Sequence, residues 1–308
     1  MTPVAPGRKV LTDTKLIVET AWSLRTVVPA FNIPYLPMMR PVVRALADAQ
    51  AFGLIQVARL EWEKFESGSL DAVRDEYEEC KDERFTRLHL DHVPVVDEDG
   101  NQVEYLKILK RALDAGYESV MVDGSRLSLR QNIETTRQAV LLAHEADIPI
   151  EGELGAVLGH EDRPLPPYEE LFASGAGFTD PEEAEKFVAA TGVDWLSVSI
   201  GNIHGAISGA ARTRKKVEAR LSLDHLSAIA SRARVPLVLH GGSGIKRDNV
   251  LEAVKRGIAK INIGTAIRAP YEAARKSSKA VAISAVYLAA QQVIQELEIA
   301  GSAKNLLS

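Results

Sequence analysis

The chain has 308 residues, of which 46% are hydrophobic and 26% are charged, so it can bury a large core as one α/β barrel or two smaller domains. Its net charge of −5 and its lack of basic clusters argue against nucleic acid as the main partner. The one cysteine, Cys80, excludes an internal disulfide framework, and without a long apolar run or a signal peptide we expect a cytoplasmic protein that does not enter a membrane.

The first half of the chain alternates segments of strand and helix character. Apolar, β-type runs predict five strands, at 27–33, 52–58, 85–92, 119–125 and 149–155. Helical spacing of apolar residues, with turn and breaker residues between, predicts helices at 16–24, 38–51 and 128–146, and one that carries Leu106, Leu109 and Leu113. A loop that contains Arg59, Glu61 and Lys64 is expected after the second strand.

The second half continues the alternation. Residues 156–178 are rich in Gly and Pro and too long for an ordinary connection, which predicts a mobile active-site loop. Thr179 is expected to cap the helix that follows, and strands are expected at 194–200, 236–241 and 258–264. Eight strands alternating with helices predict an α/β fold, a (β/α)8 TIM barrel, as a single domain over 1–308 with a C-terminal helical extension from about 277. The final helix is expected to pack on the barrel or on a second subunit.

Three of the predicted strands place a histidine at or just beyond their carboxyl ends: His92, His204 and His240. Three imidazoles with an open coordination position are typical of a catalytic divalent metal site. The last histidine leads directly into Gly241-Gly242-Ser243-Gly244, whose backbone N–H groups could hold a phosphate. For His240 alone, a histidine satisfied by its neighbours before a flexible turn is an equally good interpretation.

In such a barrel the catalytic groups lie at the carboxyl ends of the strands. The polar residues that fall there are Asn32, Asp91, His92, Asp123, Ser125, Glu153, His204, His240, Asn262 and Thr265. The loops after the seventh and eighth strands often bind phosphate, and here they read GGSG and NIGT. A metal beside a phosphate site suggests a phosphorylated sugar or a similar anion as the substrate.

Between about residues 27 and 268 the motifs AFN, HLDH, VMVDGS, EGELG, GHED, TDPEEA, IGNIHGA, LHGGSG and KINIGT follow in order. Together they resemble the class II, metal-dependent ketose-bisphosphate aldolases, which include the fructose- and tagatose-bisphosphate enzymes of carbohydrate metabolism and glycolysis. The resemblance implies reversible aldol cleavage of a ketose 1,6-bisphosphate or ketose 1-phosphate to dihydroxyacetone phosphate and an aldehyde. We also expect a homo-oligomer, a dimer or a tetramer.

The resemblance also implies roles for individual residues. His92, His204 and His240 are expected to bind the divalent ion, usually zinc, with Glu153 as an additional or alternative ligand. Asp91 is placed to take the C4 hydroxyl proton, and Glu161 to move the proton at C3 of dihydroxyacetone phosphate. Substrate-binding residues are expected at Asn32, Gly205, Gly241, Ser243, Asn262, Gly264 and Thr265, with Asn262 on the enediolate oxygens and the glycines and hydroxyls on the phosphate. Some family members also use a monovalent cation near this loop.

Several alternatives remain open at this point. Asp123 is either part of a second metal position or the cap of a turn, and Glu161 is either catalytic or a solvent-exposed loop acid. His89 is expected to orient its neighbours rather than bind metal. Lys260 lies inside a strand, so a Schiff-base mechanism is not expected. The functional alternatives are a non-catalytic or regulatory barrel subunit of the same lineage and, with less support, a zinc hydrolase.

The sequence departs from the family pattern at the end of the substrate that becomes the aldehyde. Ala58 stands where the family usually has a serine, Ala266 follows Thr265 where an acidic residue is common, and residues 93–104 differ from the usual short segment. The aldehyde is therefore not necessarily glyceraldehyde 3-phosphate. Arg59 and Lys64 lie in the altered loop, either as new cationic contacts for the substrate or as a solvated surface pair.

Overall fold

The structure is a computed structural model that describes residues 14–155, 168–202, 219–242 and 244–308. Eight parallel strands pair in sequence order and close into a barrel. They are β1 (Val28–Asn32), β2 (Gly53–Ala58), β3 (Thr86–Pro94), β4 (Ser119–Asp123), β5 (Ile150–Leu154), β6 (Trp195–Val198), β7 (Leu237–Leu239) and β8 (Ile258–Ile263). The predicted (β/α)8 barrel is confirmed.

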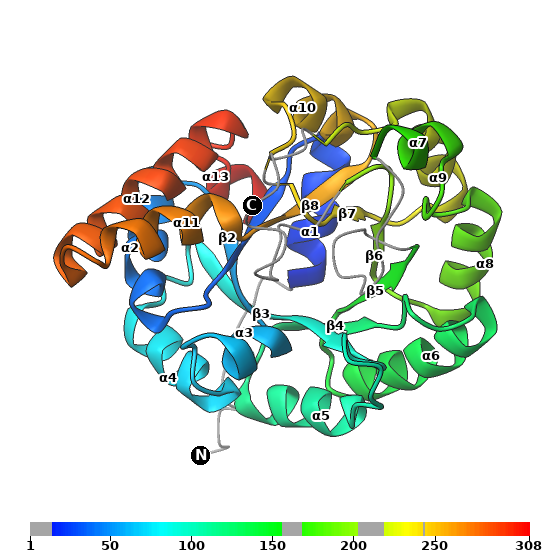
Figure 1. Cartoon of the computed structure of the whole chain (residues 1–308), viewed down its shortest axis with the longest axis horizontal. Coiled ribbons are helices and arrows are strands. Elements are labelled where there is room, and N and C mark those ends of the chain that lie inside the picture. The colour runs from blue at the N-terminus through cyan, green and yellow to red at the C-terminus, as the bar shows by residue number, and fades with distance from the viewer. Residues whose placement is uncertain (1–13, 156–167, 203–218, 243) are drawn as a thin grey trace, which may run out of the picture.

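Helices form a ring around the barrel (Figure 1). In chain order the helical elements are α1 (Thr14–Leu24), η1 (Leu36–Met38), α2 (Met39–Asp48), α3 (Arg59–Lys64), α4 (Leu70–Cys80), α5 (Tyr105–Ala115), α6 (Leu129–Glu145), α7 (Tyr168–Ser174), α8 (Pro181–Thr191), α9 (Leu223–Ala233), α10 (Arg247–Lys255), α11 (Thr265–Ala274), α12 (Lys279–Glu296) and α13 (Ala303–Leu306). None of the described helices combines the length and the apolarity needed to cross a membrane.

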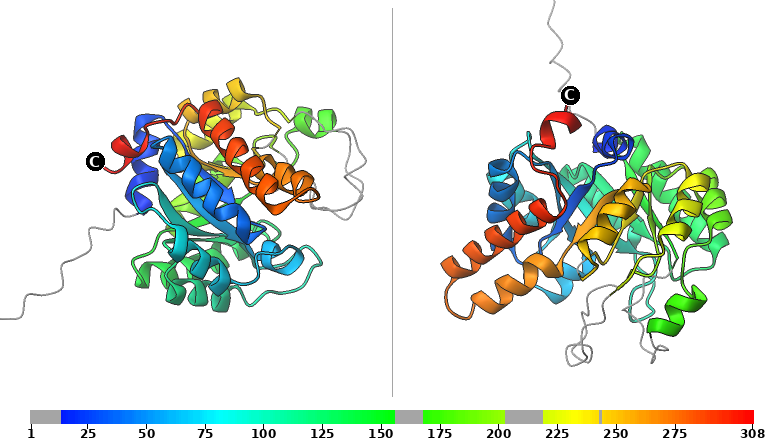
Figure 2. Two further views of the ribbon diagram at one scale, coloured as in Figure 1. Left: turned by 90° about the vertical axis from the view of Figure 1, so that its left-hand side faces the viewer. Right: turned by 90° about the horizontal axis from the view of Figure 1, so that it is seen from above.

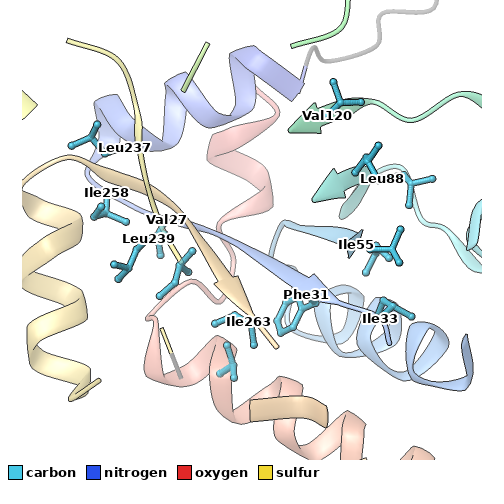
Figure 3. Packing of buried hydrophobic residues seen from close by; sticks show 14 of the residues in the cluster. Val27, Phe31, Ile33, Ile55, Leu88, Val120, Leu237, Leu239, Ile258 and Ile263 are labelled. Atoms are coloured by element: carbon cyan, nitrogen blue, oxygen red, sulfur yellow. The ribbon is translucent and has the colours of Figure 1, made fainter. Parts of the chain in front are cut away.

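Alternation along the strands divides the barrel wall into two faces. Apolar residues such as Phe31, Ile55 and Leu88 are fully or almost fully buried in the layer between strands and helices (Figure 3). Successive side chains of a strand point to opposite faces, so the residues between them point into the barrel. Many of these inward residues are polar, and they form the site described below.

The two ends of the barrel are built differently. At the end where the strands begin, α1 packs Ile17 and Ala21 in one buried cluster with Val28 of β1, Leu54 of β2 and Leu306 of α13. Figure 2 shows α1 and α13 at this end of the molecule and α7 at the other. The end where the strands finish is therefore the one left for a site, as expected for this fold.

After β8 the chain adds three helices, α11, α12 and α13. α12 packs against α11 and α2, burying residues that include Val286 and Ala290. On its other side Val281 and Leu288 are exposed, which leaves an apolar strip on the outside of the molecule.

Three local predictions were wrong. Residues 59–64 form α3 rather than a loop, because the Glu61 side chain accepts the Ala58 N–H at 2.8 Å and stabilises the first turn. The long segment predicted as a mobile loop before Thr179 contains α7, and its residues 156–167 lie outside the described residues. The cap of α8 is Asp180, which accepts the N–H groups of Glu182 and Glu183 at 2.8 and 2.9 Å.

Thr179 does not cap α8 because its side chain is used elsewhere. Its hydroxyl donates to the carbonyl of Leu154 and accepts the N–H of Ser199, which links the ends of β5 and β6. The α4 helix was also not predicted from the sequence, although Ser69 caps it by accepting the N–H of Ala72 at 3.1 Å.

Candidate active site

A bulge at the end of β3 brings Asp91 and His92 to the same side of the wall. Adjacent residues of a regular strand point to opposite faces. Here the register of β3 with β4 shifts between Leu90 and Val93, and His92 has a positive φ of 31°. Bulges with unusual backbone angles are common beside active sites, where they redirect a side chain.

Asp91 is held by three amide side chains. Asn32 and Gln56 donate to its Oδ2 at 3.0 and 3.2 Å, and Asn262 donates to its Oδ1 at 3.0 Å. Burial by itself raises the pKa of Asp91, but positive charge on His92 and Lys260 outweighs burial and holds that pKa far below its usual range. The structure therefore presents an ionised carboxylate that is 1% exposed, an arrangement suited to accepting a proton from a substrate.

Among the described residues, two overlapping groups could hold a metal ion. One consists of Asp91, His92 and His240, and the other of His92, Asp123 and Glu153, with the ligand atoms of each group within 4.8 Å of one another. Glu153 is buried, and its Oε2 makes no hydrogen bond to the described residues although it lies 3.4 Å from His240 Nδ1 and 3.7 Å from His92 Nδ1. A buried carboxylate oxygen of this kind beside two imidazoles fits a divalent ion of the zinc type.

The protonation of His92 fits the same interpretation. Burial lowers its pKa, but the carboxylates of Asp91, Asp123 and Glu153 act more strongly in the opposite direction and raise the pKa to about 10. A site that attracts a proton so strongly also attracts a metal cation, which would take the place of that proton.

A second layer of charged side chains lies one step deeper in the barrel. Glu151 is two residues before Glu153 on β5, and Lys260 is two residues before Asn262 on β8, so each pair points inward. Glu151 Oε1 lies 2.7 Å from His240 Nε2, and its Oε2 lies 2.9 Å from Lys260 Nζ and accepts the Trp195 indole N–H. Lys260 also donates to Asn262 Oδ1 at 2.7 Å.

This deeper layer orients the residues above it. Glu151 fixes the ring of His240 so that Nδ1 points toward Glu153, in the manner of carboxylates that orient metal-binding histidines. Lys260 fixes the amide of Asn262, whose nitrogen then points at Asp91. Glu151 was not among the residues predicted for the site, and Lys260 was predicted only as a strand residue.

We expect Lys260→Met to destabilise the fold strongly. The variant leaves Glu151 buried without its cation, and breaking a buried ion pair by removing one partner costs ~3–5 kcal/mol. The matched control is Lys255→Met, which removes an exposed pair with Glu252 and should cost less than about 1 kcal/mol. Urea unfolding gives both values. Equal, small losses would contradict a structural role for the buried pair.

The roles of His89 and Asp123 could not be decided from the sequence, and their contacts bear on both. His89 is fully buried, with Nδ1 2.8 Å from Ser119 Oγ, and burial is the main cause that lowers its pKa to about 3. Neither metal-binding group contains it. Asp123 caps its turn, because its Oδ1 accepts from the N–H and hydroxyl of Ser125. Its Oδ2 lies 3.4 Å from His92 Nδ1, in a group of residues that could hold a metal ion.

The expected phosphate side lies at the ends of β7 and β8. His240 follows β7 directly, and Gly241 has a positive φ of 67° that favours glycine. Gly242 packs so closely that a Cβ there would come within 2.7 Å of Ile261 Cδ1. Gly264 and Thr265 form the start of α11, and the first turn of a helix offers N–H groups to an anion.

The structure describes all but four of the predicted site residues. His204, Gly205, Glu161 and Ser243 lie outside the described residues. The others, Asn32, Asp91, His92, Glu153, His240, Gly241, Asn262, Gly264 and Thr265, all lie at or next to strand ends. Asp91 contacts both Asn32 and Asn262. Glu153 lies close to both His92 and His240.

Glu61 is a further buried carboxyl at this end of the barrel that sequence analysis assigned only to a loop. It is 9% exposed, and its Oε2 accepts the Ala58 N–H at 2.8 Å and the Asn32 amide at 3.4 Å. Burial is the main cause that raises its pKa to about 8, and the nearby negative charge of Asp91 acts in the same direction.

We expect Glu61→Gln to stabilise the protein at pH 8 but not at pH 4. At pH 4 and below, Glu61 is protonated in the folded and the unfolded chain, so its ionisation does not affect folding. As the pH rises from its ordinary pKa toward about 8, only the unfolded chain loses the proton, and the wild type loses stability that the glutamine variant keeps. Thermal unfolding of both proteins across this range measures the difference. A difference that stays constant with pH would contradict the raised pKa.

The profile of the family described as fructose-bisphosphate aldolase class-II matches residues 12–304. The 6-phospho-5-dehydro-2-deoxy-D-gluconate aldolase of Shouchella clausii (strain KSM-K16) is 39% identical over 178 residues, which are 58% of this chain and 52% of that protein. A fructose-bisphosphate aldolase of Staphylococcus aureus (strain Mu50) is 36% identical over 178 residues, 58% of this chain and 54% of its own length. These matches span about half the length of the curated relatives.

Solved structures resemble the fold over nearly its whole length. The YdjI aldolase from Escherichia coli K12 superposes with a TM-score of 0.73 at 25% identity and covers 94% of this chain and 98% of its own. The fructose-bisphosphate aldolase from Campylobacter jejuni has a TM-score of 0.67 at 16% identity, covering 92% and 94% of the two chains, and it supports the fold alone.

Proposed function

This chain belongs to the class II fructose-bisphosphate aldolase family, and from that premise we propose that it catalyses the reversible aldol cleavage of a phosphorylated ketose. The products are dihydroxyacetone phosphate and an aldehyde. The observation that carries the proposal is the buried Asp91 carboxylate, held by three amides next to His92, where His240 belongs to one group of residues that could hold a metal ion and Glu153 to another.

In this proposal Asp91 acts as the base for the bond cleavage. It takes the proton of the C4 hydroxyl, the C4 oxygen becomes the carbonyl of the aldehyde, and the electrons of the C3–C4 bond pass to C3 and the enediolate. The amides of Asn32, Gln56 and Asn262 hold the carboxylate in place. Glu161 then supplies the proton to C3, as the family pattern implies for the GHED segment.

A divalent ion, which we propose to be zinc, would polarise the C2 carbonyl and balance the negative charge that develops on the substrate. His92, His204 and His240 would hold it, with Glu153 as an additional or alternative ligand. A lysine that forms a Schiff base is not needed in this scheme. Lys260, the buried lysine below the site, is already engaged by Glu151 and Asn262.

The residues at the ends of β7 and β8 are the ones proposed to bind the phosphate of the substrate. We propose that Gly205, Gly241, Ser243, Gly264 and Thr265 bind the C1 phosphate, and that Asn32 and Asn262 contact the dihydroxyacetone half. The start of α11 at Thr265 and the positive φ of Gly241 support this assignment. A monovalent cation near this loop is part of the same proposal.

The oligomeric state, the cellular location and the pathway are also proposals. We propose a cytoplasmic homo-oligomer, a dimer or a tetramer, in which the barrel and its helical extension act as one domain. The exposed Val281 and Leu288 on α12 support contact with a second subunit. The pathway, whether glycolysis or the breakdown of a tagatose-type sugar, depends on which ketose is the substrate.

The test is a cleavage assay with the 1,6-bisphosphates and 1-phosphates of fructose and tagatose, in which released dihydroxyacetone phosphate is measured. We expect release from at least one of these ketoses. Release from none of them, by protein with its full metal content, would instead favour a non-catalytic subunit of the same lineage.

A further inference from the structure

Glu61 lies beside the proposed base, on the side of the altered loop. Ala58, the last residue of β2, is in register with Asp91 on β3, and Glu61 lies in the first turn of the helix that follows Ala58. The Asn32 amide nitrogen donates to Glu61 Oε2 at 3.4 Å and to Asp91 Oδ2 at 3.0 Å, so one amide connects the two carboxyl groups. When the C4 hydroxyl of a substrate contacts Asp91, the aldehyde half of that substrate therefore lies close to Glu61.

The second oxygen of Glu61 is available to a ligand. Oε2 receives both hydrogen bonds described above, whereas Oε1 has no hydrogen-bond partner among the described residues. Helix capping explains the position of Oε2 but gives Oε1 no role. Oε1 is not one of the fully buried atoms that lack a partner, so part of it stays accessible, and a substrate hydroxyl could form a hydrogen bond to it.

The charges around Glu61 oppose a second phosphate at this end. The two cations of α3 are already paired, Arg59 with Glu63 at 2.8 Å and Lys64 with Glu98. Asp97 Oδ2 lies 3.9 Å from Arg59 Nη1, so three carboxylates, those of Glu63, Asp97 and Glu98, pair with the two cations of α3. Burial of an anion such as phosphate is unfavourable where the cations are already neutralised.

From this arrangement we infer that Glu61 determines substrate specificity by binding a hydroxyl group of the aldehyde half, so that the enzyme prefers an uncharged, hydroxylated aldehyde over a phosphorylated one. This inference rests on the proposed aldolase function and adds the chemical class of the aldehyde. It also assigns Arg59 and Lys64 to structural ion pairs rather than to phosphate binding.

The experiment compares kcat/KM for a ketose 1-phosphate with that for the matching 1,6-bisphosphate. The wild type should favour the 1-phosphate. Glu61→Ala should lower kcat/KM for the 1-phosphate by about 10- to 100-fold, the effect of one hydrogen bond to an ionisable group, and lower it less for the bisphosphate. Glu66→Gln, which removes an exposed carboxylate just beyond α3, should leave both values unchanged.

A second measurement separates specificity from damage to the site. Exchange of the C3 proton of dihydroxyacetone phosphate with deuterated water involves no aldehyde, so Glu61→Ala should exchange at the wild-type rate. A parallel loss of exchange and cleavage would show a structural role and overturn the inference. So would a wild type that prefers the bisphosphate and keeps that preference in Glu61→Ala. Proton exchange and cleavage both absent in the wild type would instead overturn the proposed function, and this inference with it.

Discussion

Asp91→Asn is expected to lower turnover by ~10²-fold or more while leaving metal binding intact, because it removes the proton acceptor but none of the proposed metal-binding histidines. The low pKa of Asp91 means that the wild-type carboxylate is already ionised at neutral pH, so activity does not wait for its deprotonation. Steady-state cleavage and the metal content of the purified variant are the two measurements.

The proton steps can be separated further. Asp91→Asn should still exchange the C3 proton of dihydroxyacetone phosphate, whereas Glu161→Gln should lose that exchange. The control is Glu118→Gln, which changes a carboxylate at the opposite end of the barrel, where it accepts the N–H of Leu88 at 2.9 Å. If Asp91→Asn cleaved the ketose at the wild-type rate, Asp91 would not be the base.

Removal of the divalent ion is expected to abolish cleavage, and addition of zinc or a similar ion should restore it. The physical reason is that the reaction needs an electrophile at the C2 carbonyl, and the buried Lys260 is held by Glu151 and Asn262 instead of facing a substrate as a free amine. Chelation followed by metal analysis and a cleavage assay tests this directly. Borohydride added with the ketose should trap no covalent adduct.

Histidine variants provide the matched comparison. His240→Ala should lose both metal and activity, because His240 Nδ1 lies among the proposed ligands. His144→Ala removes a partly exposed histidine of α6 that contacts Asp194 at 2.9 Å, next to the start of β6 and so at the opposite end of the barrel from the site, and should change neither. Full activity after verified removal of the metal, or an adduct trapped by borohydride, would contradict the metal-dependent mechanism.

Local signals in the sequence were sufficient for most of the fold. The helix predicted at 128–146 is α6, Leu129–Glu145, because Ser128 is both a good capping residue and the observed cap. The strand predicted at 149–155 is β5, Ile150–Leu154, since a short apolar run between turn residues is a local feature. The short helices could not be predicted from local signals. α3 depends on the Glu61 bond to Ala58, and α7 on contacts such as that of Tyr168 with the distant Gly201.

The deeper layer of the site was only partly visible in the sequence. Alternation places Glu151 on the same face of β5 as Glu153, and Lys260 on the same face of β8 as Asn262, so their inward direction was predictable. Their pairing was not, because 109 positions separate Glu151 from Lys260 and only closure of the barrel brings the two strands to a common interior. The same holds for Glu61, whose burial depends on packing beside Asn32.

The sequence by itself determined which kinds of side chain stand at the strand ends, and from those the family and the type of chemistry could be inferred. The tertiary structure decided which of them work together. Asp91 and His92 are neighbours that a regular strand would send to opposite faces. The shift in register between β3 and β4, with the positive φ of His92, places both at the site, and such a shift exists only when the two strands are paired.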